Sequence, residues 1–153
     1  MSAASRMRVR DAGERDAAAV GPLLDELGYP APLEAVAARL ARLDADGGSR
    51  VLVAEDGDGL LVGLVATHLI PRLNGDRPAC KVIAMVVAAR AQGAGVGRAL
   101  MTAAEDAARA AGAERMELSS GDWRPDAHAF YTRLGFERRS STFTKALAVL
   151  PQA

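Results

Sequence analysis

The chain has 153 residues, of which 50% are hydrophobic and 25% are charged, with 19 basic and 19 acidic side chains. This length and composition are typical of one globular domain, and they exclude a disordered or fibrous protein. Because the formal net charge is zero, no broad positive field attracts a polyanion, and nucleic acid is not expected as a partner.

The N-terminal half predicts two helices and three strands. A short strand at residues 7–11 precedes a helix whose apolar residues recur at helical spacing until Gly28, a natural C-terminal cap. A second helix follows Pro32, which suits the first turn of a helix. Residues 50–55 and 60–70 are rich in Val and Leu and enclose an Asp-Gly-Asp-Gly turn, which predicts a β-hairpin.

The middle of the chain predicts a strand, a glycine-rich turn and a long helix. Residues 80–88 are apolar at both alternating positions, which is typical of a central strand that is covered on both faces. The turn leads into an amphipathic helix at about residues 95–111. Because ligands of such units lie at the C-terminal ends of the strands, we expect the functional site at this edge.

The last quarter of the chain predicts a short strand around Met116, a helix that opens at Pro125 and ends near Gly135, and a strand pair from residue 136 through residues 142–147. All the elements together predict an α+β fold, in which helices flank a mixed, mostly antiparallel sheet. Since no linker or internal repeat interrupts the pattern, the whole chain, residues 1–153, is expected to form a single domain.

The glycine-rich turn at residues 92–98 has the properties of an anion site. Small residues there let a ligand approach the main chain, and the N–H groups that begin a helix have no acceptor within it. A plain tight turn is the alternative. Two standard nucleotide motifs do not fit, because Arg98 replaces the third glycine of a dinucleotide fingerprint and the Gly-Lys-Ser/Thr of a phosphate loop is missing.

A combination of motifs points to a family. Gln-x-x-Gly-x-Gly at residues 92–97 follows the strand that contains residues 85–87, and His-Ala-Phe-Tyr at 128–131 and Leu-Gly-Phe at 134–136 come later. In this combination the chain resembles the GCN5-related N-acetyltransferases (the GNAT family), most specifically over residues 80–147. The later part also looks like the branch that contains the aminoalkylphosphonate N-acetyltransferases.

The resemblance implies an acyltransferase that moves the acetyl group of acetyl-CoA directly to the amino group of a small molecule. It implies that the strand residues Met85, Val86 and Val87 pair with the pantetheine arm, and that Arg124 contacts the cofactor or an anionic substrate. The other implied cofactor ligands form the glycine-rich turn: Gln92, Gly93, Ala94, Gly95, Val96, Gly97 and Arg98.

Direct transfer needs a neutral amine, a donor to the developing oxyanion and an acid for the leaving thiolate. The resemblance makes Tyr131 the acid, with a packing tyrosine as the alternative, and Val87 the N–H donor, with an ordinary ladder bond as the alternative. The chain departs from the family at the base, because Ile83 and Ala84 stand where many members have Glu. One alternative is a weakly basic acceptor amine, which is already neutral near pH 7. The other is a water chain to one of four side chains, of which the sequence favours none: Glu55, Glu117, His68 and His128.

The family resemblance also implies that two loops, residues 27–32 and 71–79, border the acceptor amine. Tyr29, Arg72 and Arg77 are candidates for substrate selection there, with ordinary exposed loop residues as the alternative. Two other functions stay open. The missing base suggests a non-catalytic, acyl-CoA-binding regulatory module, and the substrate is alternatively a protein, as for a protein N-acetyltransferase.

Cys80 is the only cysteine, so neither an intrachain disulfide nor a zinc cluster is expected, and no metal is assigned. The first residues lack the apolar stretch of a secretory signal. The longest apolar run, residues 82–89, is far shorter than the roughly 20 residues that span a bilayer. We therefore expect a cytoplasmic protein without a membrane partner, with a homodimer as an open alternative.

Overall fold

The computed structural model describes residues 6–119, 125–139 and 142–149. It divides the chain into two compact units, residues 1–118 and residues 119–153. Among the described residues, the first unit contains the sheet, three α-helices and two short 3-10 helices, and the second contains one α-helix and a segment without regular secondary structure.

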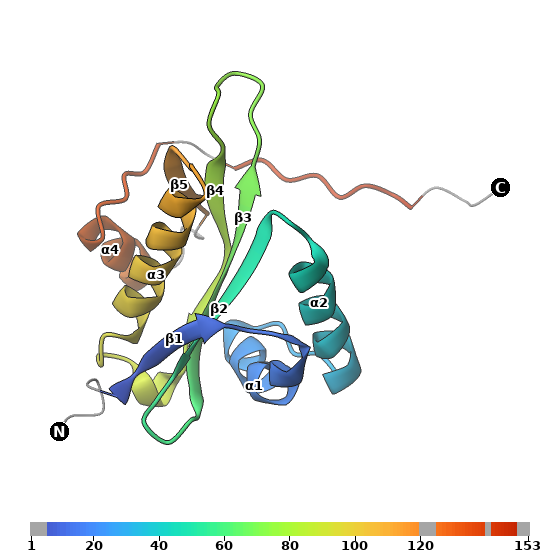
Figure 1. The fold of residues 1–153 in the computed structure, drawn as a ribbon, viewed down its shortest axis with the longest axis vertical. Coiled ribbons are helices and arrows are strands. Elements are labelled where there is room, and N and C mark those ends of the chain that lie inside the picture. The colour runs from blue at the N-terminus through green and yellow to red at the C-terminus, as the bar shows by residue number, and fades with distance from the viewer. Residues whose placement is uncertain (1–5, 120–124, 140–141, 150–153) are drawn as a thin grey trace. The chain divides into compact units, whose positions relative to one another are not determined.

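The first unit is built on a five-stranded sheet with the strands in the order β1-β2-β3-β4-β5 (Figure 1). β1 to β4 pair in antiparallel fashion, and β5 pairs parallel to β4. The strands have the following bounds: β1 (Arg8–Asp11), β2 (Ser49–Glu55), β3 (Leu61–Ile70), β4 (Ala79–Val87) and β5 (Arg115–Leu118). The predicted α+β fold with a mixed, mostly antiparallel sheet is confirmed.

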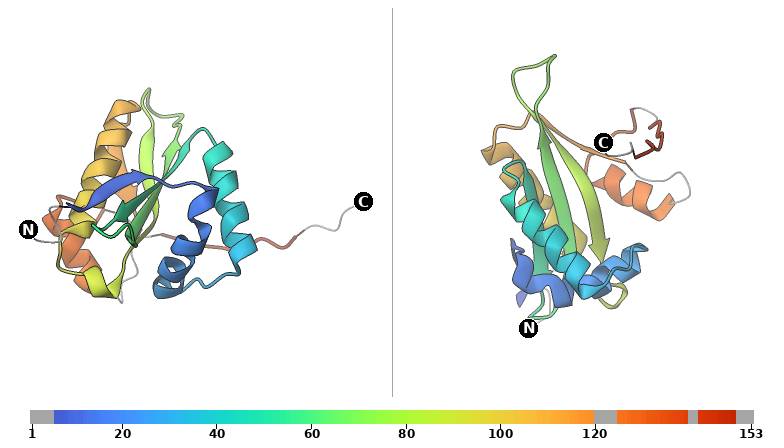
Figure 2. Two further views of the ribbon diagram at one scale, coloured as in Figure 1. Left: turned by 60° about the horizontal axis from the view of Figure 1, so that its bottom comes forward. Right: turned by 90° about the vertical axis from the view of Figure 1, so that its right-hand side faces the viewer.

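Helices cover both faces of this sheet (Figure 2). α1 (Ala17–Leu27) and α2 (Leu33–Ala45) pack on one face, where their apolar side chains join Leu64 and Ala88 in a buried cluster. α3 (Val96–Ala110) packs on the other face, where Ala108 joins Cys80. No helix within the described ranges is both long enough and apolar enough to cross a membrane.

α3 begins close to the sheet because Gly63 has no side chain. Gly63 lies on β3 opposite Val87, at the end of β4. A Cβ atom at this position would come within 3.0 Å of Leu100 Cδ1 and of Val96 Cγ1, and within 3.1 Å of the Val86 carbonyl oxygen. The missing side chain therefore lets the first turn of α3 pack directly over this end of the sheet.

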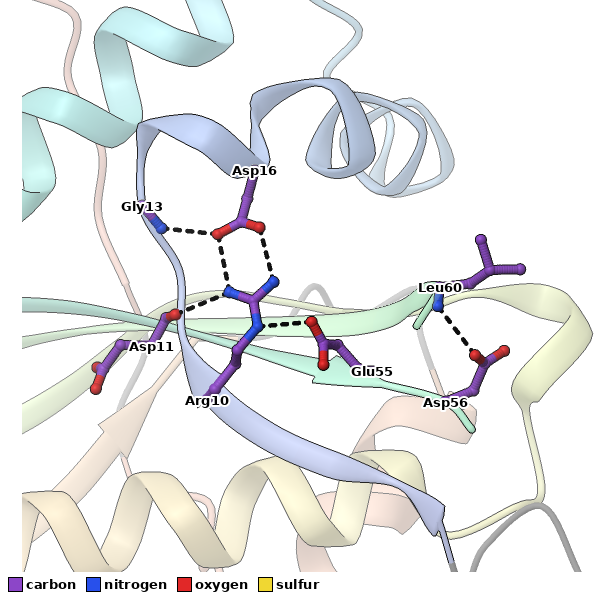
Figure 3. Close-up of polar contacts among 7 residues, drawn as sticks. All are labelled: Arg10, Asp11, Gly13, Asp16, Glu55, Asp56 and Leu60. Atoms are coloured by element: carbon purple, nitrogen blue, oxygen red, sulfur yellow. Dashed lines mark hydrogen bonds and ion pairs between the residues drawn. The ribbon is translucent and has the colours of Figure 1, made fainter. Parts of the chain in front are cut away.

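An ion network joins β1, β2 and η2 (Glu14–Asp16), the short 3-10 helix that leads into α1. Arg10 donates hydrogen bonds from Nε to Glu55 at 2.7 Å and from its two terminal nitrogens to Asp16 at 2.8 and 3.0 Å (Figure 3). Asp16 also accepts the Gly13 N–H at 2.9 Å and is 7% exposed. The hydrogen bond from Arg10 lowers the pKa of Asp16 below its ordinary value, although burial acts in the opposite direction.

The second unit contains α4 (Pro125–Arg133), which confirms the helix predicted to open at Pro125. The strand pair predicted from residue 136 onward is wrong for the residues that the structure describes there, 136–139 and 142–149, which have no regular secondary structure. The alternation that suggested a strand is present, and its apolar members are almost fully exposed: Phe143 (95%), Leu147 (85%) and Val149 (96%). A strand also needs a hydrogen-bonded neighbour, and the ladders of the described residues do not include this segment.

Replacing Asp16 by Asn should lower the free energy of unfolding at pH 7 by about 2 kcal/mol, because it removes the charged partner of a largely buried guanidinium. Since the folded-state pKa of Asp16 lies below its unfolded value of about 3.9, the carboxylate contributes fully above that value. The contribution is lost as the pH falls through the folded-state pKa. Urea titrations at a series of pH values should therefore show the wild-type advantage shrinking only below about pH 4.

The control for this prediction is Asp11→Asn, which breaks the exposed pair between Asp11 and Arg50. Because exposed pairs contribute little, its effect on unfolding should be much smaller than that of Asp16→Asn. Equal effects of the two substitutions, or a wild-type advantage independent of pH, would contradict the assigned role of the network.

Candidate functional site

β4 and β5 separate partway along β4. Their parallel ladder ends at the pair Val82 and Leu118, whereas β4 continues to Val87. In the described part of the chain, residues 84–87 therefore have a paired strand only on the β3 side. We call residues 83–87 the open edge of β4.

A β-bulge at Ile83 begins the open edge. Thr67 of β3 pairs with Val82 and the preceding Ala66 pairs with Ala84, so Ile83 is an extra residue without a partner on β3. A bulge of this kind bends a strand and interrupts the ladder locally. It marks the place where β4 stops pairing with β5.

The bulge corrects the prediction that residues 80–88 are covered throughout. Cys80 is 2% exposed, whereas Ile83 is 49% exposed and residues 84–87 are only half-buried. The bulge also shifts the alternation of side chains by one residue. Cys80 therefore packs on the α3 side, whereas Ala84 and Val86 pack against the cluster beneath α1 and α2.

The backbone N–H of Val87 points toward the open edge. The next residue, Ala88, donates its N–H to the Val62 carbonyl of β3 at 2.8 Å. Successive residues of an antiparallel strand direct their N–H groups to opposite sides. The N–H groups of Val87 and Met85 therefore point away from β3, and the N–H group of Val86 points toward it. An ordinary ladder bond from the Val87 N–H to β3 is thus excluded.

The turn that follows β4 has two positions where the backbone favours glycine. Gly93 and Gly95 have φ angles of 82° and 83°, in the left-handed region. A Cβ atom added at either position would have nothing within 4 Å, so the space above both residues is open. Relief of backbone strain explains why these residues are glycines, and the open space makes their backbone accessible to a ligand.

α3 begins directly after this turn without a side-chain cap. Gly95 is its N-cap residue, and the first bond of the helix runs from the Ala99 N–H to the Gly95 carbonyl at 3.0 Å. The N–H groups of residues 96–98 precede that bond and have no acceptor within the helix. Uncapped N–H groups and the positive end of the helix dipole together fit the pyrophosphate of a nucleotide cofactor.

A carboxylate that the sequence analysis did not single out lies at the end of β4. Glu26 of α1 accepts a hydrogen bond from the Ala89 N–H at 2.8 Å, although the two residues are 63 positions apart. Nothing in the local sequence signals this contact, which only the packing of α1 against the sheet creates. Tyr29, a predicted acceptor-side residue, lies just beyond α1 and is 68% exposed.

The structure does not bring the predicted bases of the first unit to the open edge. Glu55 is held by Arg10 in the ion network. Glu117 and His68 both lie opposite Lys81, on the half of β4 that precedes the bulge. They are therefore separated from Val87 and the glycine-rich turn by several residues of strand.

Arg72 and Arg77 lie at the opposite end of α3 from the glycine-rich turn. Arg77 donates to the carbonyl oxygens of Gly112 and Ala113 at 3.1 and 3.0 Å, and Arg72 pairs with Glu114. These contacts stabilise the chain after α3, and they do not support the predicted role of the two arginines in substrate selection.

Tyr131 lies on α4, in the second unit. Its ring makes edge-on contacts with Phe130 and Phe136, at centroid distances of 5.4 and 5.9 Å. His128, the fourth predicted base, is on the same helix, and its carbonyl oxygen accepts the Thr132 hydroxyl at 2.8 Å. The catalytic role of Tyr131 stays a prediction, and Arg124, a predicted cofactor contact, lies outside the described residues.

Comparison with known proteins gives a family match. A family model described as the acetyltransferase (GNAT) family matches residues 22–136, which include the open edge, the glycine-rich turn and α4. The chain is also similar to an aminoalkylphosphonate N-acetyltransferase from Salmonella typhimurium. The two are 36% identical over 125 residues, which cover 82% of this chain and 78% of the relative.

Solved structures show the same fold. A GNAT family acetyltransferase from Staphylococcus aureus superposes with a TM-score of 0.80 at 20% identity, over 93% of this chain and 99% of that one. A transcriptional regulator from Bacillus halodurans has a TM-score of 0.82 at 25% identity, over 92% of this chain and 99% of that one.

Substituting Gly95 tests the anion site. Asn and Asp have the same shape and both tolerate a left-handed backbone, so a comparison of Gly95→Asn with Gly95→Asp isolates the effect of a negative charge. We expect Gly95→Asp to bind coenzyme A at least about tenfold more weakly than Gly95→Asn, because the added carboxylate repels the pyrophosphate. Calorimetry with coenzyme A measures this ratio.

The same pair of substitutions at Gly112 is the control, because Gly112 also has a left-handed φ of 83° but follows the far end of α3. Asn and Asp at that position should bind coenzyme A equally well. Equal affinities for the two Gly95 variants would show that no phosphate lies near the start of α3.

Proposed function

Because the chain belongs to the GNAT family of acetyltransferases, we propose that it transfers the acetyl group of acetyl-CoA to the amino group of a small molecule. The observation that carries the proposal is the open edge of β4, which leads directly into the uncapped start of α3. An open strand edge offers hydrogen bonds to an extended chain that contains amides, such as pantetheine. The start of the helix offers N–H groups to the attached diphosphate.

In the proposed reaction, acetyl-CoA supplies an activated acetyl thioester, and groups of the chain bind it and assist the transfer. The N–H of Val87, which faces the open edge, donates to the thioester oxygen as negative charge develops there. The neutral amine forms its C–N bond as the C–S bond breaks, and the Tyr131 hydroxyl gives its proton to the departing sulfur. The proton that the amine nitrogen then loses passes through water and restores the phenol. Met85, with the residues of the glycine-rich turn, holds the cofactor in place.

We propose aminoalkylphosphonates as the first acceptor class to test, because the relative that is 36% identical is described as acting on them. We further propose that residues 1–153 work as one N-acetyltransferase domain. The family match supports this, since residues 22–136 extend across the boundary between the two compact units at Leu118.

An acceptor screen tests the proposed function. Acetyl-CoA is incubated with the protein and with aminoalkylphosphonates, amino acids, polyamines or aminoglycosides, and the release of free thiol is measured. We expect acceptor-dependent release with at least one aminoalkylphosphonate. Binding of coenzyme A without release would favour a non-catalytic module, and acetylation of peptides alone would favour a protein acetyltransferase. Failure of coenzyme A to bind would overturn the whole proposal.

Replacing Tyr131 by Phe tests the proposed acid. The substitution keeps the ring that contacts Phe130 and Phe136 and removes only the hydroxyl. Turnover should fall by about 100-fold, which is typical of the loss of a general acid, while the affinity for acetyl-CoA changes little. Steady-state rates combined with calorimetry separate the two effects. Unchanged turnover would show that Tyr131 serves only to pack α4.

A further inference from the structure

The hydrogen bond between Glu26 and Ala89 fixes a carboxylate at the end of the open edge. Ala89 directly follows Ala88, which is fully buried and bonded to β3. Ala89 is two residues beyond Val87, and a strand advances about 3.3 Å per residue. The Glu26 carboxylate is therefore held within roughly 10 Å of the N–H proposed to face the reacting carbonyl.

This carboxylate has capacity for a ligand. An ionised carboxylate accepts about four hydrogen bonds, and Glu26 is an exposed residue whose Oε1 receives one bond, from Ala89. No arginine, lysine or histidine among the described residues forms an ion pair with it. Glu55 and Glu117, by contrast, already accept hydrogen bonds from Arg10 and Arg115.

The acceptor of an acetyl group carries a complementary charge, because most amines bind as ammonium ions near neutral pH. In this chain the central strand has no carboxylate to receive that ion, since Ile83 and Ala84 stand at the positions where the family resemblance leads one to expect Glu. Glu26 supplies a negative charge from the neighbouring helix instead. It lies on the same helix end as Tyr29, whose exposed ring follows the cap of α1.

We propose that Glu26 binds the ammonium group of the acceptor and so selects amines at the end of the open edge. This inference rests on the proposed acetyltransferase function, and it adds an acceptor-binding residue on α1. Glu26 thereby has two contacts, the Ala89 N–H through one oxygen and the acceptor ammonium through the rest of the carboxylate. A charged hydrogen bond of this kind typically changes affinity by tenfold or more.

The test compares two ligands that differ only in the amino group, aminomethylphosphonate and methylphosphonate. Their affinities are measured by calorimetry on the protein saturated with coenzyme A, where no transfer takes place. We expect the wild type to bind aminomethylphosphonate at least about tenfold more tightly than methylphosphonate. In Glu26→Gln this ratio should fall close to one, because the amide oxygen still accepts the Ala89 N–H but carries no charge.

Asp25→Asn is the matched control, since it removes one negative charge from the neighbouring exposed residue of the same helix. Asp25→Asn should keep the wild-type ratio of the affinities for aminomethylphosphonate and methylphosphonate. Glu26→Asp should restore part of the preference for aminomethylphosphonate that Glu26→Gln loses. The affinity for coenzyme A should stay within about twofold in all variants, which excludes a general loss of structure.

The outcomes separate this inference from the function on which it rests. Failure of the wild type to bind coenzyme A would overturn both. Normal binding of coenzyme A, combined with a ligand ratio near one in the wild type or an unchanged ratio in Glu26→Gln, would overturn the role of Glu26 alone. An equal loss of the ratio in Asp25→Asn would show that the effect comes from general charge rather than from Glu26.

Discussion

The separation of β4 from β5 after the pair Val82 and Leu118 is the constraint on which the site depends. In the interior of a sheet, backbone N–H and C=O groups are satisfied on both sides, and nothing is left for a ligand. Beyond the bulge at Ile83, the described part of β4 is paired only with β3, so its other side presents unused backbone groups. The affinity that we propose for an amide-containing arm would therefore come mainly from main-chain geometry.

Most of the fold could be predicted because its elements follow local sequence patterns. The cofactor-binding residues stay a prediction. Apolar periodicity marked the helices and the central strand, and the glycine-rich turn marked the start of α3. The family resemblance came from a combination of motifs between residues 85 and 136, and the match to residues 22–136 confirmed it. Each helix or strand was predicted from a short run of consecutive residues, where propensity and backbone geometry dominate.

The features that sequence reasoning missed depend on register or on distant contacts. The bulge at Ile83 exists only relative to the pairing of β3 and β4, which a single apolar run does not specify. The bond between Glu26 and Ala89 and the caps that Arg77 forms near Gly112 join segments far apart in the chain. The prediction of a strand after residue 136 was wrong for a related reason. An alternating pattern shows that residues suit a strand, but it does not specify a neighbouring strand with which they could pair.

Gly63 shows how a residue with no chemistry of its own sets the dimensions of the site. The missing methyl group sets the spacing between β3 and the first turn of α3, and that turn carries the N–H groups proposed for the diphosphate. A larger residue at this position would push the helix outward and displace those donors from the end of β4. The position of the proposed cofactor site is thus set in part by a residue on β3, the strand next to the one that the cofactor is proposed to contact.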